Sequence, residues 1–155
     1  MAAYSFITCW HVRAPIEAVW KAIFRSERWP SWWKGLERVV ELEPGDPTRV
    51  GCIRRFVWKG RLPYRLVVDM RVTRIEPPVA LESIASGELE GTGRWRLSND
   101  EGGTKACYEW NVRTAKRWMN RLAPIARPFF QWNHDVVMRA GERGLRRLLE
   151  TAAGQ

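Results

Sequence analysis

The sequence predicts an α+β fold in which a curved antiparallel sheet of six to seven strands wraps around a long C-terminal helix, with two short helices after the first strand. Three observations predict it. Apolar residues alternate with period two through most of the chain, the turn signals between these segments are short, and a long amphipathic segment comes last. With 155 residues, the chain is expected to form a single domain over residues 1–155.

The first strand is expected over residues 4–12. Aromatic and β-branched side chains are frequent in this segment, and they alternate between two faces, as is typical of a strand. The face expected to point inward carries Tyr4, Phe6, Thr8, Trp10 and Val12.

Two short helices are expected next. Pro15 suits the first position of a helix, because the missing N–H is not needed there. Residues 16–23 place apolar side chains at helical spacing. Residues 27–35 are expected to form a break followed by a second short helix, which Gly35 closes.

Six further strands are expected, joined by turns rich in Pro, Gly and Asn. Such short connections favour antiparallel neighbours, because a parallel crossover needs about a dozen residues or more. Several strands are apolar on one face and charged on the other, so one face of the sheet must be covered. Gly91 and Gly93 suit a bend in this sheet. The expected ranges are 36–43, 50–59, 64–75, 79–86, 88–98 and 104–115.

The element expected to cover the sheet is a helix from Pro128 to about Glu150. A helix of this length spans roughly 35 Å, which is enough to cross a small sheet. Gly141 and Gly144 weaken a helix, so we expect them to permit a close approach to the sheet. The apolar stripe comprises Phe130, His134, Val137, Gly141, Leu145 and Leu148.

The composition argues against several classes of protein. The net charge is +9, but no run of five basic residues occurs, so a specific nucleic-acid partner is not expected, whereas transient contact with an anionic membrane fits the charge. No segment is apolar over the roughly 18–20 residues that a membrane span needs. The N-terminal segment lacks the pattern of a signal peptide, so we expect a cytoplasmic protein, as a monomer or homodimer.

The three cysteines, Cys9, Cys52 and Cys107, are odd in number and show no CxxC spacing. We therefore expect small buried side chains rather than a disulfide framework or a zinc site. With only two histidines, no metal site is expected. No phosphate-binding or dinucleotide-binding motif is present, so no cofactor is expected.

Several segments carry a resemblance to a known family. They are APIEAVW (14–20), WPSWW (29–33), GRLPYRL (60–66), SGELEGTGRW (86–95), GGTKACYEW (102–110) and ARPFFQWNHDVVMRAGERGL (126–145). Together they resemble the SRPBCC superfamily, which includes START lipid-transfer domains and birch-pollen-allergen-like proteins, and within it the polyketide cyclase/dehydrase-like branch. The resemblance implies a helix-grip fold with a hydrophobic cavity under the long helix, and it implies no particular reaction.

Ten tryptophans suggest the walls of that cavity, because an indole offers a large apolar face to a flat or isoprenoid ligand. Trp58 and Trp95 lie on faces expected to point inward, and Trp32 and Trp33 lie where the resemblance implies an entrance. The expected ligand-binding residues are Trp32, Trp33, Arg54, Phe56, Trp58, Tyr64, Leu66, Met70, Trp95, Tyr108, Trp110, Phe130, Asn133, His134 and Val137.

Three of these residues are candidates for chemistry. His134 suits acid–base work near neutral pH, although a structural hydrogen bond between helix and sheet is an equally simple role. Arg54 points inward by its alternation with Phe56 and could bind an anionic ligand group, unless a register irregularity places Arg54 and Arg55 both outside. Tyr64, like Tyr108, could donate a phenolic hydrogen bond or satisfy a nearby carbonyl.

Three functions follow as hypotheses. The first is binding of a hydrophobic small molecule (a polyketide, aromatic, isoprenoid or lipid-like compound) by a carrier or sequestering protein. The second is a cofactor-independent enzyme of the polyketide cyclase or dehydratase type. The third is a basic module that binds nucleic acid or an anionic membrane, and its affinity should collapse as salt is raised.

Overall fold

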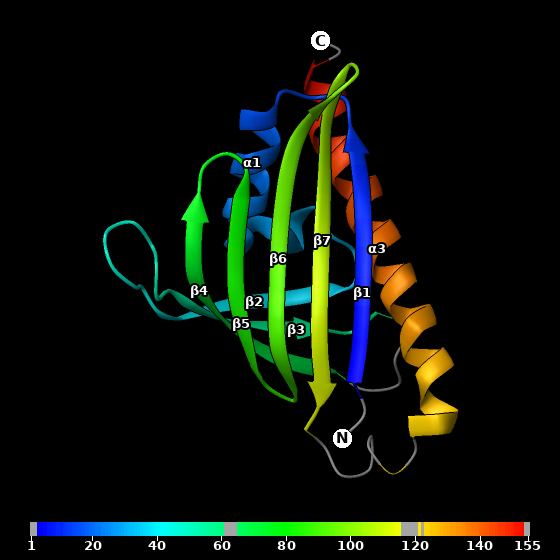
Figure 1. Ribbon diagram of the computed structural model, residues 1–155. Helices are drawn as coiled ribbons and strands as arrows, with labels where there is room; N and C mark the ends of the chain where they lie inside the picture. Colours follow the sequence, from blue (N-terminus) through cyan, green and yellow to red (C-terminus); the bar gives the residue numbers. More distant parts are fainter. Residues whose placement is uncertain (1–2, 61–64, 116–120, 122, 154–155) are drawn as a thin grey trace.

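The computed structural model describes residues 3–60, 65–115, 121 and 123–153. Figure 1 shows its elements in chain order. They are β1 (Ala3–Val12), α1 (Ile16–Phe24), the 3₁₀ helix η1 (Ser26–Ser31), β2 (Leu36–Glu43), β3 (Ile53–Trp58), β4 (Leu66–Glu76), β5 (Ala80–Gly87), β6 (Leu89–Asp100), β7 (Gly103–Thr114) and α3 (Ala123–Ala153).

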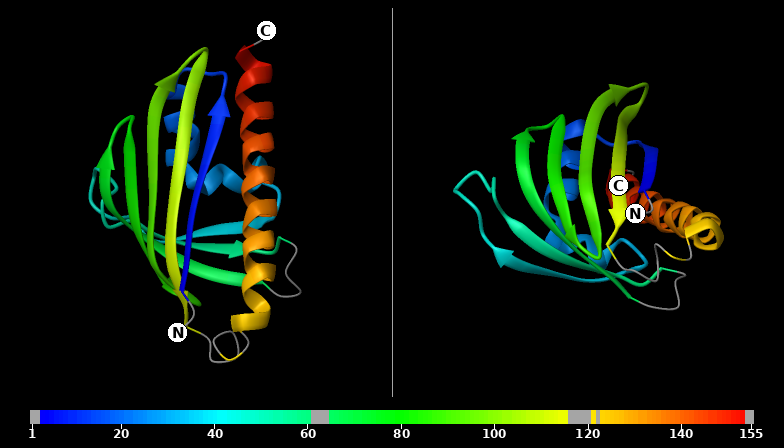
Figure 2. Two further views of the ribbon diagram at one scale, coloured as in Figure 1. Left: turned by 45° about the vertical axis from the view of Figure 1, so that its right-hand side comes forward. Right: turned by 60° about the horizontal axis from the view of Figure 1, so that its bottom comes forward.

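The seven strands form one antiparallel sheet in the order β1-β7-β6-β5-β4-β3-β2. The expected α+β helix-grip fold is therefore confirmed, including the two short helices after the first strand. In Figure 2 the sheet is strongly bent, and its concave side faces the helices. The strand ranges differ from the expected ones by at most three residues, because the turn residues between them stop the ladders where the sequence indicates.

Irregular pairing contributes to the bend of the sheet. The register shifts in β2 between Leu36 and Arg38, and in β4 between Val72 and Arg74. Gly91 in β6 has a φ of +153°, and a Cβ atom there would lie 2.0 Å from the carbonyl oxygen of Asn111 on β7. A residue with a side chain does not fit at this point, which agrees with the expected role of Gly91 in the bend.

The long helix differs from the expectation at both ends. It begins at Ala123, so the expected start at Pro128 is wrong, and Pro128 lies inside the helix. A proline this close to the start removes only one intrahelical hydrogen bond, and the helix continues across it. Leu148, expected in the buried stripe, is 45% exposed. Leu149 packs against the core in its place, because both residues follow Leu145 by about one turn.

The two helix glycines lie where another part of the chain comes very close. A Cβ atom on Gly141 would lie 2.6 Å from the ring of Trp33 and 2.7 Å from that of Trp10. A Cβ atom on Gly144 would lie 1.7 Å from the carbonyl oxygen of Trp32. The expected close approach is confirmed, but it is made largely to the segment that follows η1 rather than to the sheet alone.

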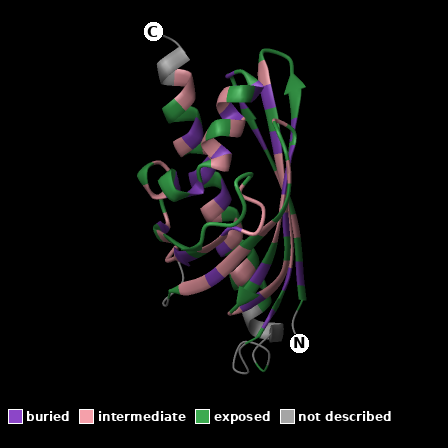
Figure 3. Cartoon of the chain, turned by 90° about the vertical axis from the view of Figure 1, so that its left-hand side faces the viewer, coloured by how far each residue is buried: buried purple, intermediate pink, exposed green. Residues whose placement is uncertain are grey.

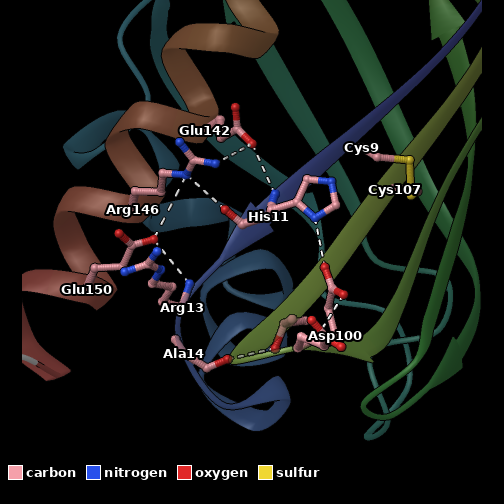
Figure 4. Close-up of polar contacts among 11 residues, drawn as sticks. Cys9, His11, Arg13, Ala14, Asp100, Cys107, Glu142, Arg146 and Glu150 are labelled. Carbon is pink, nitrogen blue, oxygen red and sulfur yellow. Dashed lines mark hydrogen bonds and ion pairs between the residues drawn. A yellow bond between two sulfur atoms is a disulfide. The ribbon is translucent and has the colours of Figure 1, made fainter.

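Side chains of α3 bind the free edge of β1, as Figure 4 shows. Glu142 accepts a hydrogen bond from the backbone N–H of His11 at 3.0 Å, and Glu150 accepts one from that of Arg13 at 3.1 Å. Arg146 donates to the carbonyl oxygen of His11 at 2.8 Å. These contacts satisfy backbone groups that an edge strand otherwise leaves unpaired, and they fix α3 against the sheet.

Two of the three cysteines are bonded to each other. Cys9 and Cys107 are register partners on β1 and β7, and they form a disulfide (Figure 4). The expectation that all three are buried thiols is wrong for this pair, because directly opposed residues in an antiparallel ladder are close enough to be bridged. It holds for Cys52, which is a free, buried thiol.

Buried side chains gather in two hydrophobic clusters on the inner side of the sheet. The larger contains Trp10, Trp29, Trp33 and Trp95, and the smaller contains Tyr4 with residues of β4 to β7. Met70 packs against both. Figure 3 shows buried and exposed positions alternating along the strands, so the sheet has one covered and one wet face, as the sequence predicts.

Candidate ligand-binding cavity

A cavity of about 180 Å³ lies between the concave face of the sheet and the helices α1, η1 and α3. It extends between the two hydrophobic clusters, because a bent sheet and a straight helix touch along a limited line. Most of its walls are aromatic and aliphatic. The side chains with polar groups among the residues that line it, apart from the tryptophans, are Tyr4, Ser26, Arg49, Cys52, Arg54, Ser83, Tyr108, Thr114, Asn133 and His134.

Almost all of the ligand-binding residues expected from the sequence lie on this cavity. The exceptions are Trp32, which packs against Trp10 and Trp29 instead, and Tyr64, which lies outside the described residues. Contact with a ligand stays a prediction for the others. They are Trp33, Arg54, Phe56, Trp58, Leu66, Met70, Trp95, Tyr108, Trp110, Phe130, Asn133, His134 and Val137.

Two tryptophans of the cavity wall have their indole N–H groups bonded to the backbone. Trp33 donates from Nε1 to the carbonyl oxygen of Val137 at 2.8 Å, and Trp29 donates to that of Ala22 at 3.1 Å. Their polar edges are therefore satisfied by the backbone. What remains for a ligand is the ring surface, which favours flat or aliphatic groups over polar ones.

Arg54 gives the cavity one charged end. Its side chain is only 14% exposed. The guanidinium donates to Oγ of Ser26 at 2.7 Å and forms ion pairs with Glu27 at 3.1 Å and Glu41 at 3.2 Å. The register of β3 against β4 is regular through Arg54 and Arg55, so the alternative that placed both side chains outside is wrong. Arg55 alone faces out, bound to Asp69.

Carboxylates balance the charge at this end. Glu41 also binds Arg49. Partial desolvation opposes the ionisation of Glu41, but hydrogen bonds from Arg49 and Arg54 outweigh it and lower its pKa. Burial raises the pKa of the neighbouring Cys52 thiol. The cavity thus ends in a paired, polar cluster rather than in a free positive charge.

His134 lies on the opposite wall, on α3. Its imidazole stacks on the ring of Phe6, with 4.0 Å between the ring centroids. Its Nε2 atom is buried and has no hydrogen-bond partner among the residues that the structure describes. Burial lowers the pKa of His134 to about 4, although nearby Asp135 opposes the shift. The side chain is neutral at pH 7, which makes it a weak acceptor of protons there.

Tyr108, on β7, is a third polar side chain of the cavity wall. Its ring contacts that of Trp95 at 4.6 Å between centroids, and a Cβ atom on Gly93 would lie 2.2 Å from its hydroxyl oxygen. Gly93 thus leaves room for the hydroxyl. Burial raises the pKa of Tyr108, so the phenol stays protonated and is a hydrogen-bond donor at neutral pH.

Sequence reasoning missed several residues of the cavity wall. Tyr4 and Phe6 share the inward face of β1 with Trp10, so their alternation carried the signal. Trp29 lies in η1, whose short 3₁₀ geometry gives no clear periodicity. Ser26 and Arg49 also line the cavity, and no spacing pattern in the sequence connects them with Arg54.

Among the described residues, no three His, Cys, Asp or Glu side chains are grouped so as to hold a metal ion. No helix in the same residues is both long and apolar enough to cross a membrane.

Solved structures with the same fold include aromatase/cyclases. The di-domain ARO/CYC protein BexL from the BE-7585A biosynthetic pathway matches with a TM-score of 0.73 at 17% identity, covering 93% of this chain and 49% of that chain, so the present chain spans about half its length. The Zhui aromatase/cyclase from Streptomyces sp. R1128 matches with a TM-score of 0.69 at 13% identity, covering 94% and 95% of the two chains. Ara h 8.0201 matches with a TM-score of 0.59 at 13% identity, covering 93% and 98%.

The fold and these neighbours define a helix-grip protein. The model of the family "Polyketide cyclase / dehydrase and lipid transport" matches residues 8–152. The chain therefore belongs to this family, as the resemblance of its segments indicates. No curated protein sequence matches it.

Proposed function

We propose that the protein binds a hydrophobic small molecule in its cavity, as a carrier or sequestering protein. The observation that carries the proposal is an internal space of about 180 Å³ with mainly aromatic and aliphatic walls. A dry apolar cavity of roughly 150 Å³ accepts benzene, so this space suits one or two fused rings, or a segment of an acyl or isoprenoid chain, without side-chain movement.

The polar groups of the cavity would orient such a ligand. Tyr108 offers a phenolic donor on the cavity wall, and Arg54 contributes a guanidinium. Because Glu27 and Glu41 already neutralise Arg54, a carbonyl or hydroxyl group fits beside this guanidinium better than a second carboxylate does. We therefore favour a neutral, mostly apolar ligand with one or two oxygen atoms.

The test is native mass spectrometry and organic extraction of freshly purified protein, followed by titration with an apolar fluorescent dye. Met70→Trp fills the space between the two clusters and should reduce dye binding about tenfold or more. Arg71→Trp adds the same side chain to the next, exposed position of β4 and should leave dye binding unchanged. Apo protein that takes up no dye, or equal loss in both variants, would contradict the proposal.

A cofactor-independent cyclase or dehydratase is the second candidate. A phenol and a guanidinium in an otherwise apolar cavity favour it, because both can stabilise the oxyanion that forms when an enolate carbon attacks a carbonyl. The cavity would fold the substrate so that these carbons meet. For such an enzyme, Tyr108→Phe abolishes turnover of a linear polyketide-like substrate and leaves dye binding intact. A carrier shows binding and no turnover.

A further inference from the structure

Three arginines form a row on the outer side of α3. Arg139, Arg143 and Arg147 follow one another at intervals of four residues, and all three are exposed. In the described part of the chain none of them has an ion pair or a hydrogen bond. Like charges at this spacing destabilise a helix, and no described carboxylate forms an ion pair with this row.

Several other arginines are paired with carboxylates. On the outer face of the sheet, Arg55 binds Asp69 at 2.8 Å and Arg65 binds Glu37 at 2.7 Å. Arg74 binds Glu82 in the same way at 2.8 Å. Even on α3, Arg146 is held by Glu142 and β1. Within the described residues, Arg139, Arg143 and Arg147 thus form a row of unpaired positive charge along one side of α3.

Two exposed aromatic residues continue the same row toward the start of α3. Phe129 is 41% and Trp132 is 49% exposed, and their ring centroids lie 5.8 Å apart. With Arg139, Arg143 and Arg147 they form what we call the α3 outer face. It spans about 27 Å along the helix at 1.5 Å per residue. Asp135 is an acidic residue exposed on the same stretch.

We propose that the α3 outer face docks on an anionic membrane surface, with the helix lying parallel to the bilayer. Phe129 and Trp132 would enter the headgroup region, and the three arginines would bind lipid phosphates and carboxylates. A helix with aromatic and basic residues on its exposed side is typical of such binding.

The same features disfavour two other partners. The two rings contact each other, whereas rings that bind single-stranded nucleic acid must leave their faces open for bases. A second copy of the chain would bring two basic rows together, and like charges repel. Phe130, between the two exposed aromatic residues, lines the cavity, so a bilayer docked here would border the cavity wall. Docking itself does not depend on the proposed ligand.

The test is co-sedimentation with vesicles of phosphatidylcholine and phosphatidylserine in equal amounts, compared with pure phosphatidylcholine vesicles. The wild type should bind the anionic vesicles, and the bound fraction should fall as the salt concentration is raised. The triple variant Arg139→Gln, Arg143→Gln and Arg147→Gln should lower the partition constant roughly a hundredfold, as expected for three arginines at an anionic surface.

A matched control removes the same charge elsewhere. Arg38, Arg71 and Arg96 are exposed on the strands and are likewise without an ion pair within the described residues. Changing all three to Gln should alter the partition constant less than about threefold, because this face does not meet the membrane. Equal loss in both triple variants would show that net charge alone acts and would overturn the proposal.

The aromatic residues are tested separately. Phe129→Ala with Trp132→Ala should weaken vesicle binding about tenfold or more, whereas Ile7→Ala, at a residue 72% exposed on β1, should not. Circular dichroism and thermal unfolding confirm that each variant folds. Either of two results would overturn the proposal. In the first, the α3 outer face binds a single-stranded oligonucleotide but does not bind vesicles. In the second, Phe129 and Trp132 are needed for self-association of the protein and not for lipid binding.

Discussion

The imidazole of His134 on α3 stacks on the ring of Phe6 on β1, at 4.0 Å between centroids and 17° between planes. The contact joins the long helix to the first strand across the wall of the cavity. It also buries Nε2 of His134 without a partner among the described residues, so the charged form of the imidazole is strongly disfavoured.

The first prediction concerns stability and pH. The pKa of His134 is about 4 in the folded state, against an ordinary value of 6.5. Between these two pH values the unfolded chain therefore binds more protons than the folded protein does. The free energy of unfolding falls as the pH drops from about 6.5 toward 4, by up to about 3 kcal/mol. In His134→Phe, which keeps the stack on Phe6, chemical denaturation should show a smaller fall between pH 7 and 5. Equal slopes in both proteins would contradict the assignment.

The second prediction concerns the packing of α3. Gly144→Ala improves helix propensity by about 1 kcal/mol, yet the new methyl group meets the carbonyl oxygen of Trp32. A backbone atom cannot move aside cheaply, so we expect a net loss of about 1–3 kcal/mol in the free energy of unfolding. Asp135→Ala, on the exposed side of the same helix, should change it by less than about 0.5 kcal/mol. A more stable Gly144→Ala protein would mean that the helix lies farther from Trp32.

The third prediction concerns the disulfide. Cys9 and Cys107 are 98 residues apart in the sequence, so their bond closes a long loop in the unfolded chain. Its removal in Cys9→Ser with Cys107→Ser should lower the free energy of unfolding by about 2–4 kcal/mol. A reducing agent should lower the melting temperature of the wild type and leave that of the double variant unchanged.

Thiol titration in denaturant checks the same bond. One free thiol per chain, that of Cys52, is expected without reductant and three with it. Disulfides persist mainly in oxidising compartments, whereas the sequence led us to expect a cytoplasmic protein. Three free thiols in protein isolated without reductant would favour the cytoplasmic expectation and contradict the bond.

The fourth prediction concerns the polar end of the cavity. Hydrogen bonds from Arg49 and Arg54 lower the pKa of Glu41. In Arg54→Met one of these donors is lost, so the pKa of Glu41 should rise toward its ordinary value. The stability that the ionised carboxylate contributes above that value should then decrease. Carbon-detected NMR titration of the side chain measures the shift, with Arg55→Met on the outer face as the control. An unchanged pKa would show that Arg49 alone holds Glu41.

Local patterns in the sequence predicted most of the fold. Alternation in residues 4–12 placed Tyr4 and Trp10 on the buried side of the first strand, and the turn residues placed the strand boundaries. The sequence left two alternatives for Arg54: its side chain points inward, or a register irregularity places Arg54 and Arg55 both outside. Local sequence cannot distinguish them, because the same residues can form either a regular strand or a bulge. The pairing of β3 with β4 decides between them.

The sequence by itself determined the order of the elements, the faces of the strands and most of the side chains around the cavity, because these depend on the period of apolar residues along the chain. Only the tertiary structure decided which residues from distant elements contact each other. These contacts join Cys9 with Cys107, Phe6 with His134, and Arg54 with Ser26 and Glu41. Such pairs are set by strand register and by the path of α3 over the sheet. Both depend on how the whole chain packs and on no local stretch of residues.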